Sequence, residues 1–166
     1  MTIRNVDPSD AARIAGIYNH YITGTIVTFE TDPVTPEEIG RRMRAVTRDY
    51  PYLAVEDDAG MLTGYAYASR FREREAYRHT AEVTIYLDRD RTGAGFGAPL
   101  FAELLGRLRE TDTVALIGAI ALPNEPSVGL HEKFGFRKVA HLEKVGHKFG
   151  KWIDVGYWEL LIREAA

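Results

Sequence analysis

A glycine-rich turn between a strand pattern and a helix pattern constrains the fold of this chain more than any other feature. The segment 83–87 is β-prone, residues 91–97 follow with glycines at 93, 95 and 97, and an amphipathic run begins near Ala98. The first amides of a helix have no helical carbonyl to bond and lie at the positive end of the helix dipole. Glycines permit positive φ angles and let an anion approach the backbone. The segment therefore predicts an anion cradle where a strand turns into a helix.

The spacing of these glycines does not match two familiar nucleotide motifs. No Gly-Lys-Ser/Thr follows, as a Walker A loop requires, and no ribose-binding acid stands about 20 residues further on, as a dinucleotide fingerprint requires. A tight turn whose glycines serve only packing is the competing interpretation. The choice between the two rests on the other polar residues.

Length, charge and cysteine content restrict the class of protein. A chain of 166 residues suits one domain, residues 1–166, with a substantial core. The 21 basic and 24 acidic residues give a net charge of −3, which argues against nucleic-acid or membrane binding. The absence of cysteine excludes disulfides, thiolate metal sites and a cysteine nucleophile, and we expect no metal. No apolar run is long enough for a signal or spanning segment, so we expect a cytoplasmic protein.

Residue periodicity predicts a mixed α/β fold. Hydrophobic patterns and capping residues give the order β-α-α-β-β-β-α-β-α-β-β, a mixed sheet with helices on its faces. That order assigns no function by itself. The predicted strands are 3–6, 50–55, 62–69, 80–87, 114–122, 136–145 and 152–161, the last two joined by a turn at 146–150. The predicted helices follow a cap at 7–10, a capping box at 35–38, the glycine turn and Asn124; the second ends near Arg48 and the fourth at Gly135, and the segment 25–29 is β-prone.

Glu82 lies inside the β-rich run 80–87, a few residues before the glycines. A buried and unpaired carboxylate costs several kcal/mol, so this side chain either lies on a solvated face or is placed for use. An exposed strand glutamate is the simpler interpretation. Beside an anionic cofactor held by the cradle, a carboxylate with a raised pKa could remove a proton, which suggests acyl transfer.

Another group of polar residues follows the apolar run 114–122. Asn124 and Ser127 stand in the first turn of a predicted helix, and His131, four residues after Ser127, lies on the same face. Such a set suits the polar wall of a site next to the cradle. A helix cap with a surface histidine is the competing interpretation.

The polar loop at 70–79 carries alternate arginines at 70, 72 and 74. Guanidinium groups bind carboxylates or phosphinates in a bidentate manner, although a solvated loop is the usual reason for such a run. We assign Arg72 and Arg74 to a site and Arg70 to the solvated surface. Tyr77 and Phe29 could wall the same pocket, while aromatic residues more often belong to a core.

Together these segments resemble the GNAT superfamily of acyl-CoA N-acyltransferases, and within it the phosphinothricin N-acetyltransferase group that includes methionine sulfoximine acetyltransferases. The resemblance covers almost the whole chain, and it implies the GNAT fold, a central mixed twisted sheet flanked by about four helices. It rests on Asn19-His20-Tyr21, Thr28-Phe29-Glu30-Thr31-Asp32-Pro33, Ala76-Tyr77-Arg78-His79-Thr80-Ala81-Glu82, Gly93-Ala94-Gly95-Phe96-Gly97, Pro123-Asn124-Glu125-Pro126-Ser127, Leu130-His131-Glu132 and Lys148-Phe149-Gly150-Lys151-Trp152-Ile153-Asp154-Val155-Gly156.

The resemblance also implies roles for individual residues, with acetyl-CoA as the cofactor. Glu82 would be the general base, and His131 the acid that protonates the departing thiolate. Amides of Ile85, Tyr86 and Leu87 would hold the acetyl group and pantetheine. The pyrophosphate would meet Gly93, Ala94, Gly95, Phe96, Gly97 and Ala98, the cofactor would also contact Asn124 and Ser127, and the amino acid would contact Phe29, Arg72, Arg74, Glu75, Ala76 and Tyr77.

Two departures from the family pattern concern the cradle. The family's Arg/Gln-x-x-Gly-x-Gly/Ala motif begins here with Thr92, so a side-chain contact to phosphate is missing unless Arg91 turns inward. Pro99 removes one N–H from the first turn of the helix. We therefore expect weaker cofactor binding, with the remaining amides still forming the cradle.

We expect direct transfer to a small glutamate-like amino acid of the phosphinothricin, methionine sulfoximine or methionine sulfone type. Glu82 would take the ammonium proton, and a strand N–H near Tyr86 would meet the carbonyl oxygen. The alternatives are another small amine or a protein N-terminus as acceptor, or a non-catalytic acetyl-CoA-binding module. A base paired with an acid argues against the last. The resemblance further implies a homodimer and a link to herbicide resistance.

Overall fold

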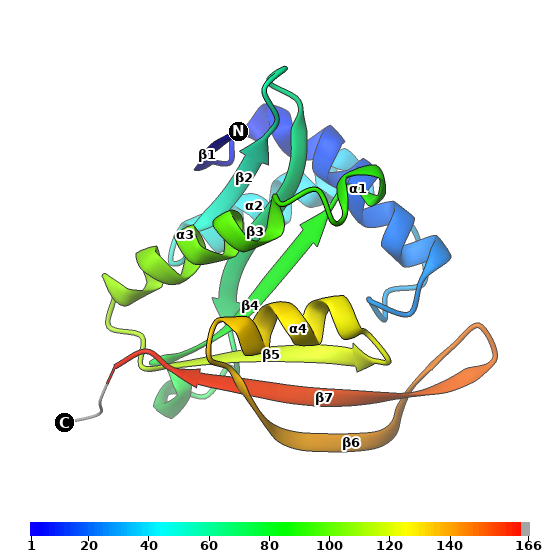
Figure 1. Cartoon of the computed structure of the whole chain (residues 1–166), viewed down its shortest axis with the longest axis vertical. Helices are drawn as coiled ribbons and strands as arrows, with labels where there is room; N and C mark the ends of the chain where they lie inside the picture. Colours follow the sequence, from blue (N-terminus) through cyan, green and yellow to red (C-terminus); the bar gives the residue numbers. More distant parts are fainter. Residues whose placement is uncertain (164–166) are drawn as a thin grey trace.

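A seven-stranded mixed sheet with the strand order β1-β2-β3-β4-β5-β7-β6 organises the computed structural model, which describes residues 1–163 (Figure 1). Neighbouring strands are antiparallel except β4 and β5, which are parallel because α3 crosses over between them. The strands are β1 (Thr2–Asn5), β2 (Tyr52–Glu56), β3 (Leu62–Arg70), β4 (Thr80–Leu87), β5 (Ala115–Leu122), β6 (Arg137–Lys148) and β7 (Lys151–Leu161). The helices are α1 (Ala11–Gly24), α2 (Pro36–Thr47), α3 (Gly97–Arg109) and α4 (Glu125–Lys133), with short 3-10 turns at Pro8–Asp10, Glu75–Tyr77 and Arg89–Arg91.

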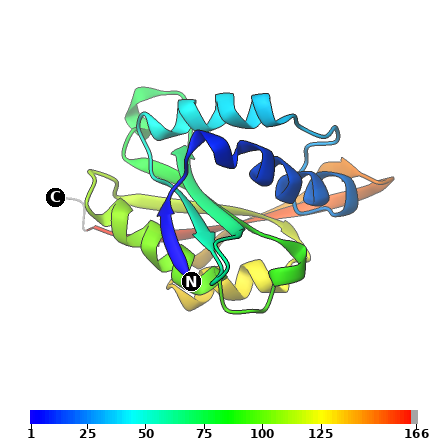
Figure 2. The same ribbon diagram turned by 90° about the horizontal axis from the view of Figure 1, so that it is seen from above.

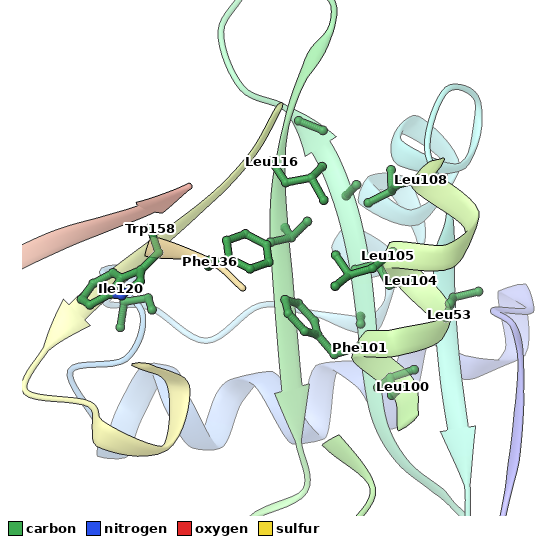
Figure 3. Close-up of a cluster of buried hydrophobic side chains, with 14 of the residues drawn as sticks. Leu53, Leu100, Phe101, Leu104, Leu105, Leu108, Leu116, Ile120, Phe136 and Trp158 are labelled. Carbon is green, nitrogen blue, oxygen red and sulfur yellow. The ribbon is translucent and has the colours of Figure 1, made fainter. Parts of the chain in front are cut away.

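Helices cover both faces of the sheet. Figure 2 shows α1 and α2 on one face and α3 and α4 on the other. On the second face, the predicted apolar side of α3 packs against β2, β3 and β4, and the aromatic rings of Phe101 and Phe136 lie 5.8 Å apart (Figure 3). Burying a leucine or phenylalanine side chain contributes about 1.5–3 kcal/mol, so this face supplies much of the stability. Its fully buried α3 residues are Leu100, Phe101, Leu104, Leu105 and Leu108.

Local caps start the 3-10 turn that leads into α1 and the helix α2 in different ways. The reciprocal capping box forms at the first predicted cap, where Asp10 accepts from the Asp7 amide at 2.7 Å. At the second, Thr35 accepts from the Glu38 amide at 3.2 Å, but the Glu38 carboxylate pairs with two arginines of α2 instead of returning to Thr35. The capping box predicted at 35–38 is therefore only half formed, because a guanidinium is the stronger partner for a carboxylate.

Most predicted elements are confirmed within two residues of their predicted ends, and one hairpin differs. The predicted turn at 146–150 is wrong in length, because β6 continues to Lys148 and only Phe149 and Gly150 form the turn. Their φ angles of 52° and 70° are the left-handed values that a two-residue hairpin turn requires. The β-prone segment 25–29 forms no strand and belongs to the loop between α1 and α2.

Candidate active site

The site begins where β4 and β5 separate. The two strands pair only from Thr80 opposite Ala115 to Glu82 opposite Ile117, and then they spread apart (Figure 1). Beyond Glu82, the edge of β4 that faces β5 has no strand partner in the described chain. A parallel sheet that opens at the carboxyl ends of its strands is a common place for a ligand site.

Backbone alternation decides which amides of β4 face this opening. The amide of Asp88, directly after the strand, donates to the Thr63 carbonyl on the β3 side at 2.7 Å. Amides two residues apart point the same way, so the amide of Tyr86 also faces β3. The amides of Ile85 and Leu87 therefore face the opening. Three residues were predicted around the acetyl group. Ile85 and Leu87 direct their N–H groups into the opening between β4 and β5, whereas Tyr86 contributes its side chain to the lining.

A cavity of about 470 Å³ occupies the opening. It is bounded by β4 and β5, by the first turns of α4, by the α1–α2 loop and by the β6–β7 hairpin. Its volume lies in the range of small-molecule sites, and its surface combines polar and apolar groups. The lining residues are Val27, Thr28, Phe29, Glu82, Val83, Thr84, Ile85, Tyr86, Ala119, Ile120, Ala121, Asn124, Ser127, His131, Leu142, Val145, Val155 and Tyr157.

Glu82 lines the cavity at the point where β4 leaves β5. Its side chain lies on the same face of the sheet as those of Thr84 and Tyr86, because side chains two apart in a strand share a face. Burial raises the pKa of the Glu82 carboxyl above its usual range, while the charge of Arg72 acts in the opposite direction. A carboxylate with a raised pKa is better able to accept a proton near neutral pH.

His131 is buried, with 3% of its surface exposed, on the inner side of α4. Its Nδ1 lies 2.8 Å from the Ser127 carbonyl, which can only accept, so the neutral ring carries its proton on Nδ1. Its Nε2 is buried and has no hydrogen-bond partner within residues 1–163. A Cβ on Gly118 of β5 would lie 2.6 Å from Nε2, so glycine is needed there. Burial lowers the pKa of His131, which favours the neutral ring with a free acceptor at Nε2.

The other two predicted residues of this region, Asn124 and Ser127, lie at the start of α4. Asn124 caps the helix, its Oδ1 accepting from the Ser127 amide at 3.3 Å. Both residues also line the cavity. Asn124 therefore acts as a helix cap and also belongs to the wall of the site. Capping occupies its Oδ1 and leaves its Nδ2 group for other contacts.

The glycine turn has the backbone geometry of an anion cradle in part. Gly93 and Gly95 adopt φ angles of 76° and 88°, the positive values that glycine permits, whereas Gly97 begins α3. The Ala94 amide is already bonded to the Arg91 carbonyl at 3.2 Å. Within the described chain, the amides of Gly95, Phe96, Gly97 and Ala98 donate to no backbone carbonyl or side chain, and these four are available to an anion.

Arg91 does not turn toward the cradle. Its guanidinium pairs with Asp57 of the β2–β3 turn at 3.0 Å. Asp57 also accepts from the amides of Ala59 and Met61 at 3.0 Å each, so the carboxylate is fixed in place. The neighbouring Thr92 uses its hydroxyl to bond the Arg89 carbonyl. Neither side chain is therefore available to an anion at this turn, which leaves the backbone amides.

The residues predicted to bind the substrate fall into two groups. Phe29 lines the cavity, and the charge of Arg72 acts on Glu82 although its side chain is exposed and lies over Phe71. The other four are exposed on the β3–β4 loop and do not line the cavity. These four are Arg74, Glu75, Ala76 and Tyr77.

The position of Phe29 depends on the β6–β7 hairpin. Its ring packs on the backbone of Gly146, where a Cβ would lie 2.3 Å from Phe29 Cζ. Next to this contact, the buried Nζ of Lys148 donates to the Thr28 carbonyl at 2.8 Å. The hairpin therefore holds the α1–α2 loop against the cavity.

Sequence reasoning missed the residues that the hairpin and the loop contribute to the cavity. Val27, Leu142, Val145 and Tyr157 all line it, yet the sequence shows them as ordinary residues of β-prone runs. Their proximity depends on how a distant hairpin is placed, and local periodicity carries no signal for that. Among residues 1–163, no group of three or more histidine or carboxylate side chains is arranged to hold a metal ion.

Comparisons with known proteins agree with this geometry. A family model described as an acetyltransferase (GNAT) domain matches residues 3–156. The chain is 36% identical over 157 residues to a phosphinothricin N-acetyltransferase of Streptomyces viridochromogenes, covering 95% of this chain and 85% of the relative. It is 32% identical over 167 aligned positions to an L-methionine sulfoximine/L-methionine sulfone acetyltransferase of Salmonella typhimurium, covering 100% and 97%. A GNAT superfamily phosphinothricin acetyltransferase from Sinorhizobium meliloti, solved in complex with acetyl-CoA, superposes with a TM-score of 0.94 at 33% identity, covering 96% and 87%.

Proposed function

The chain belongs to the acetyltransferase (GNAT) domain family, and on that premise we propose that it acetylates the amino group of a small glutamate-like amino acid. The acceptors we propose are of the phosphinothricin, methionine sulfoximine or methionine sulfone type, after the relatives' names. One observation carries the proposal. A single cavity is lined by Glu82, by the open edge of β4 and by His131. The family and the fold are as the sequence predicted.

The residues present fit acetyl-CoA. The free amides of residues 95–98 suit the diphosphate, and the amides of Ile85 and Leu87 at the open edge of β4 suit the acetyl end and the pantetheine arm. When bound, acetyl-CoA supplies a thioester whose carbonyl carbon accepts the amine. Because Arg91 is paired with Asp57, binding would depend on the backbone, which agrees with the weaker affinity expected from Thr92.

Glu82 is the proposed general base. An amino acid arrives as an ammonium ion, and the unprotonated amine is the nucleophile. Glu82 would remove the first proton, directly or through water, and release it to solvent. Transfer would then be direct, and the amide of Ile85 or Leu87 would stabilise the negative charge that develops on the carbonyl oxygen.

His131 is proposed to handle the second proton. The nitrogen that attacks must lose another proton to become an amide, and the departing thiolate must gain one. Nε2 of His131 starts as a free acceptor, so it can take that proton and then pass it to sulfur. The balance leaves one proton in solvent and one on the thiol.

A thiol-release assay with a panel of amines tests the proposal. Acetyl-CoA would be combined with phosphinothricin, methionine sulfoximine, methionine sulfone, a polyamine and a peptide with a free N-terminus. We expect kcat/KM to be highest for the first three. Preference for the polyamine or the peptide would show that the acceptor belongs to a different class. Calorimetric binding of acetyl-CoA without thiol release for any amine would show that the protein is a non-catalytic binding module. Phosphinothricin turnover would also support the predicted link to herbicide resistance.

We also propose that the enzyme is a homodimer. Among the large apolar side chains that the β6–β7 hairpin exposes are Val139, Phe149 and Trp152, with exposed fractions of 47%, 55% and 66%. Apolar groups gathered on one projecting element are typical of an interface. Light scattering of the purified protein at several concentrations tests this, and a monomer at every concentration would contradict it.

No helix within residues 1–163 combines the length and hydropathy needed to cross a membrane.

A further inference from the structure

Strand β6 contains a large bulge beside the cavity. Leu142 stands opposite Val155 and Gly146 stands opposite Ile153, so residues 143–145 of β6 face the single residue Asp154 of β7. Lys144, in the middle of this bulge, adopts a φ of 54°. A left-handed conformation at a residue other than glycine persists only where surrounding contacts stabilise it.

The side chain of Asp154 supplies those contacts. Its Oδ1 accepts from the Lys144 amide at 2.9 Å, and its Oδ2 lies 2.7 Å from Nε2 of His141. The other ring nitrogen of His141 lies 2.8 Å from Nζ of Lys138, which can only donate, so Nε2 carries the proton and donates to Asp154. These two hydrogen bonds lower the pKa of the Asp154 carboxyl. A single carboxylate thus bonds to both the start and the middle of the bulge.

The bulge determines which side chains reach the cavity. Leu142 and Val145 are three residues apart, and in a regular strand side chains three apart point to opposite faces. Both nevertheless line the same cavity. On the regular partner strand, Val155 and Tyr157 line it with the ordinary spacing of two. The inserted residues therefore turn a second apolar side chain of β6 into the cavity, as bulges next to active sites do.

This apolar wall lies next to the residue predicted to contact the amino acid. Gly146, which ends the bulge, packs against the ring of Phe29. The amides of residues 95–98 do not line this cavity. The predicted cofactor contacts that do line it belong to β4 and to the start of α4, and they are Ile85, Tyr86, Asn124 and Ser127. A change in the bulge should therefore affect acceptor binding more than cofactor binding.

We propose that Asp154 is a positioning residue for acceptor selectivity, holding the β6 bulge so that Leu142 and Val145 form one wall of the acceptor pocket. The inference rests on the proposed function, and it deepens it by assigning selectivity to the hairpin. Asp154 itself touches no reacting atom. Its effect is exerted through the two side chains that it places.

The test compares two substitutions at one position. D154A removes both hydrogen bonds, whereas D154N keeps an oxygen for the Lys144 amide and is the conservative variant. For the amino acid that the wild type uses best, D154A should raise the acceptor KM about tenfold, and D154N should restore most of it. The ratio of kcat/KM between a long and a short amino acid should fall in D154A, while the acetyl-CoA KM stays within about twofold. D49N, at an exposed aspartate beyond α2, is the matched control and should change none of these quantities.

Amide hydrogen exchange gives a readout that does not depend on activity. In D154A the Lys144 amide should exchange faster, because it loses its acceptor, and in K144G it should stay protected, since glycine adopts a φ of 54° without strain. K144G should also keep wild-type selectivity. If D154A proved too unstable to assay, K144V would strain the same bulge while leaving Asp154 in place, and it should reproduce the loss of selectivity.

Two results would overturn the inference. One is unchanged acceptor selectivity in D154A with a faster Lys144 exchange, which would make the bulge irrelevant to the acceptor. The other is an equal rise of the acceptor and acetyl-CoA KM values, which would indicate general loosening. If the wild type acetylated no amino acid but acetylated another amine, the proposed function would fail, and the D154A comparison on that other amine would still decide the role of the bulge.

Discussion

The proposed cofactor side of the site is made largely of backbone, whereas the proposed acceptor side is made of side chains. The cofactor side comes from one continuous stretch, β4 followed by the glycine turn. The acceptor side joins the α1–α2 loop to the β6–β7 hairpin, and the bond from Lys148 Nζ to the Thr28 carbonyl spans 120 residues of sequence at 2.8 Å. Acetyl-CoA is the same in every reaction, and backbone amides can bind it whatever the acceptor. Side chains on the acceptor side can be changed individually by substitution. Cofactor binding and acceptor choice should therefore be separable by mutation.

The largest effect is expected at Glu82, where the two sides meet. E82Q should lower kcat by about 100-fold or more, because glutamine keeps the shape of the side chain and cannot accept the ammonium proton. Since burial raises the pKa of this carboxyl, wild-type activity should fall as pH decreases through that pKa, and the fall should be absent in E82Q. Steady-state rates across pH, with calorimetry for acetyl-CoA, give the measurement.

The control for this variant is E110Q, at an exposed glutamate at the end of α3, which should behave as the wild type. Acetyl-CoA affinity in E82Q should match the wild type. Wild-type turnover in E82Q would remove the assignment of the base, and a lost acetyl-CoA affinity would show that the two sides cannot be separated at this position.

A second variant tests the cofactor side alone. Gly95 has a φ of 88° and open space around its Cα, so G95A is strained by conformation rather than by a clash. A residue other than glycine there costs about 1–2 kcal/mol, and relaxation of the turn should raise the acetyl-CoA KM about tenfold. The acceptor KM should not change.

Gly150 provides the matched control for G95A. It has a φ of 70° and open space in the β6–β7 turn, so G150A carries the same kind of strain in a different part of the chain from the amides of residues 95–98. G150A should lower the melting temperature as G95A does and leave the acetyl-CoA KM unchanged. Equal effects on acetyl-CoA in both variants would mean that strain, and not the cradle, decides cofactor binding.

The same division explains how much the sequence could predict. Local rules are sufficient for the backbone of the glycine turn, because the glycines at 93 and 95 are followed directly by a helix, and for the position of Glu82, because it lies in the strand that leads to them. The acceptor wall needs two distant segments to meet. Asp154 and Lys144 look like ordinary polar residues of a hairpin, and the bulge between them depends on side-chain bonding that no periodicity reports.

Details of the cradle and of the hairpin were also beyond local rules. Gly93 and Gly95 take positive φ angles while α3 begins at Gly97, and the sequence does not separate these roles, since a helix start and a left-handed turn can both follow from glycine. The turn predicted at 146–150 is longer than the observed one, and Gly146 lies inside β6, where the ring of Phe29 closely approaches its backbone. In both places, tertiary contacts decided the role of a glycine.

Two aromatic residues that were both predicted for the acceptor wall provide a third test. Phe29 and Tyr77 have the same exposed fraction of 41%, but only Phe29 lines the cavity. F29A should raise the acceptor KM about fivefold through loss of apolar contact, with an unchanged acetyl-CoA KM. Y77A should have a smaller effect. An equal loss in Y77A would bring the β3–β4 loop into the acceptor side and shift the boundary drawn here.

The smallest effect concerns His131, which lines the cavity between the two sides, and it appears in stability rather than in selectivity. Burial lowers the pKa of His131 in the folded protein below the value of about 6.5 expected in the unfolded chain. Protons then bind the unfolded chain more readily, so this contribution to the unfolding free energy is complete above about pH 6.5 and is lost as pH falls toward the folded pKa. One such group changes the unfolding free energy by at most about 1.4 kcal/mol per pH unit.

Urea unfolding from pH 7.5 to pH 5 should show this loss in the wild type and in H147F, which alters an exposed histidine of β6, and a smaller loss in H131F. The opposite slope at His131 would mean that the folded protein holds this ring as a cation. It would then carry a proton for the thiolate from the start, instead of collecting it from the amine.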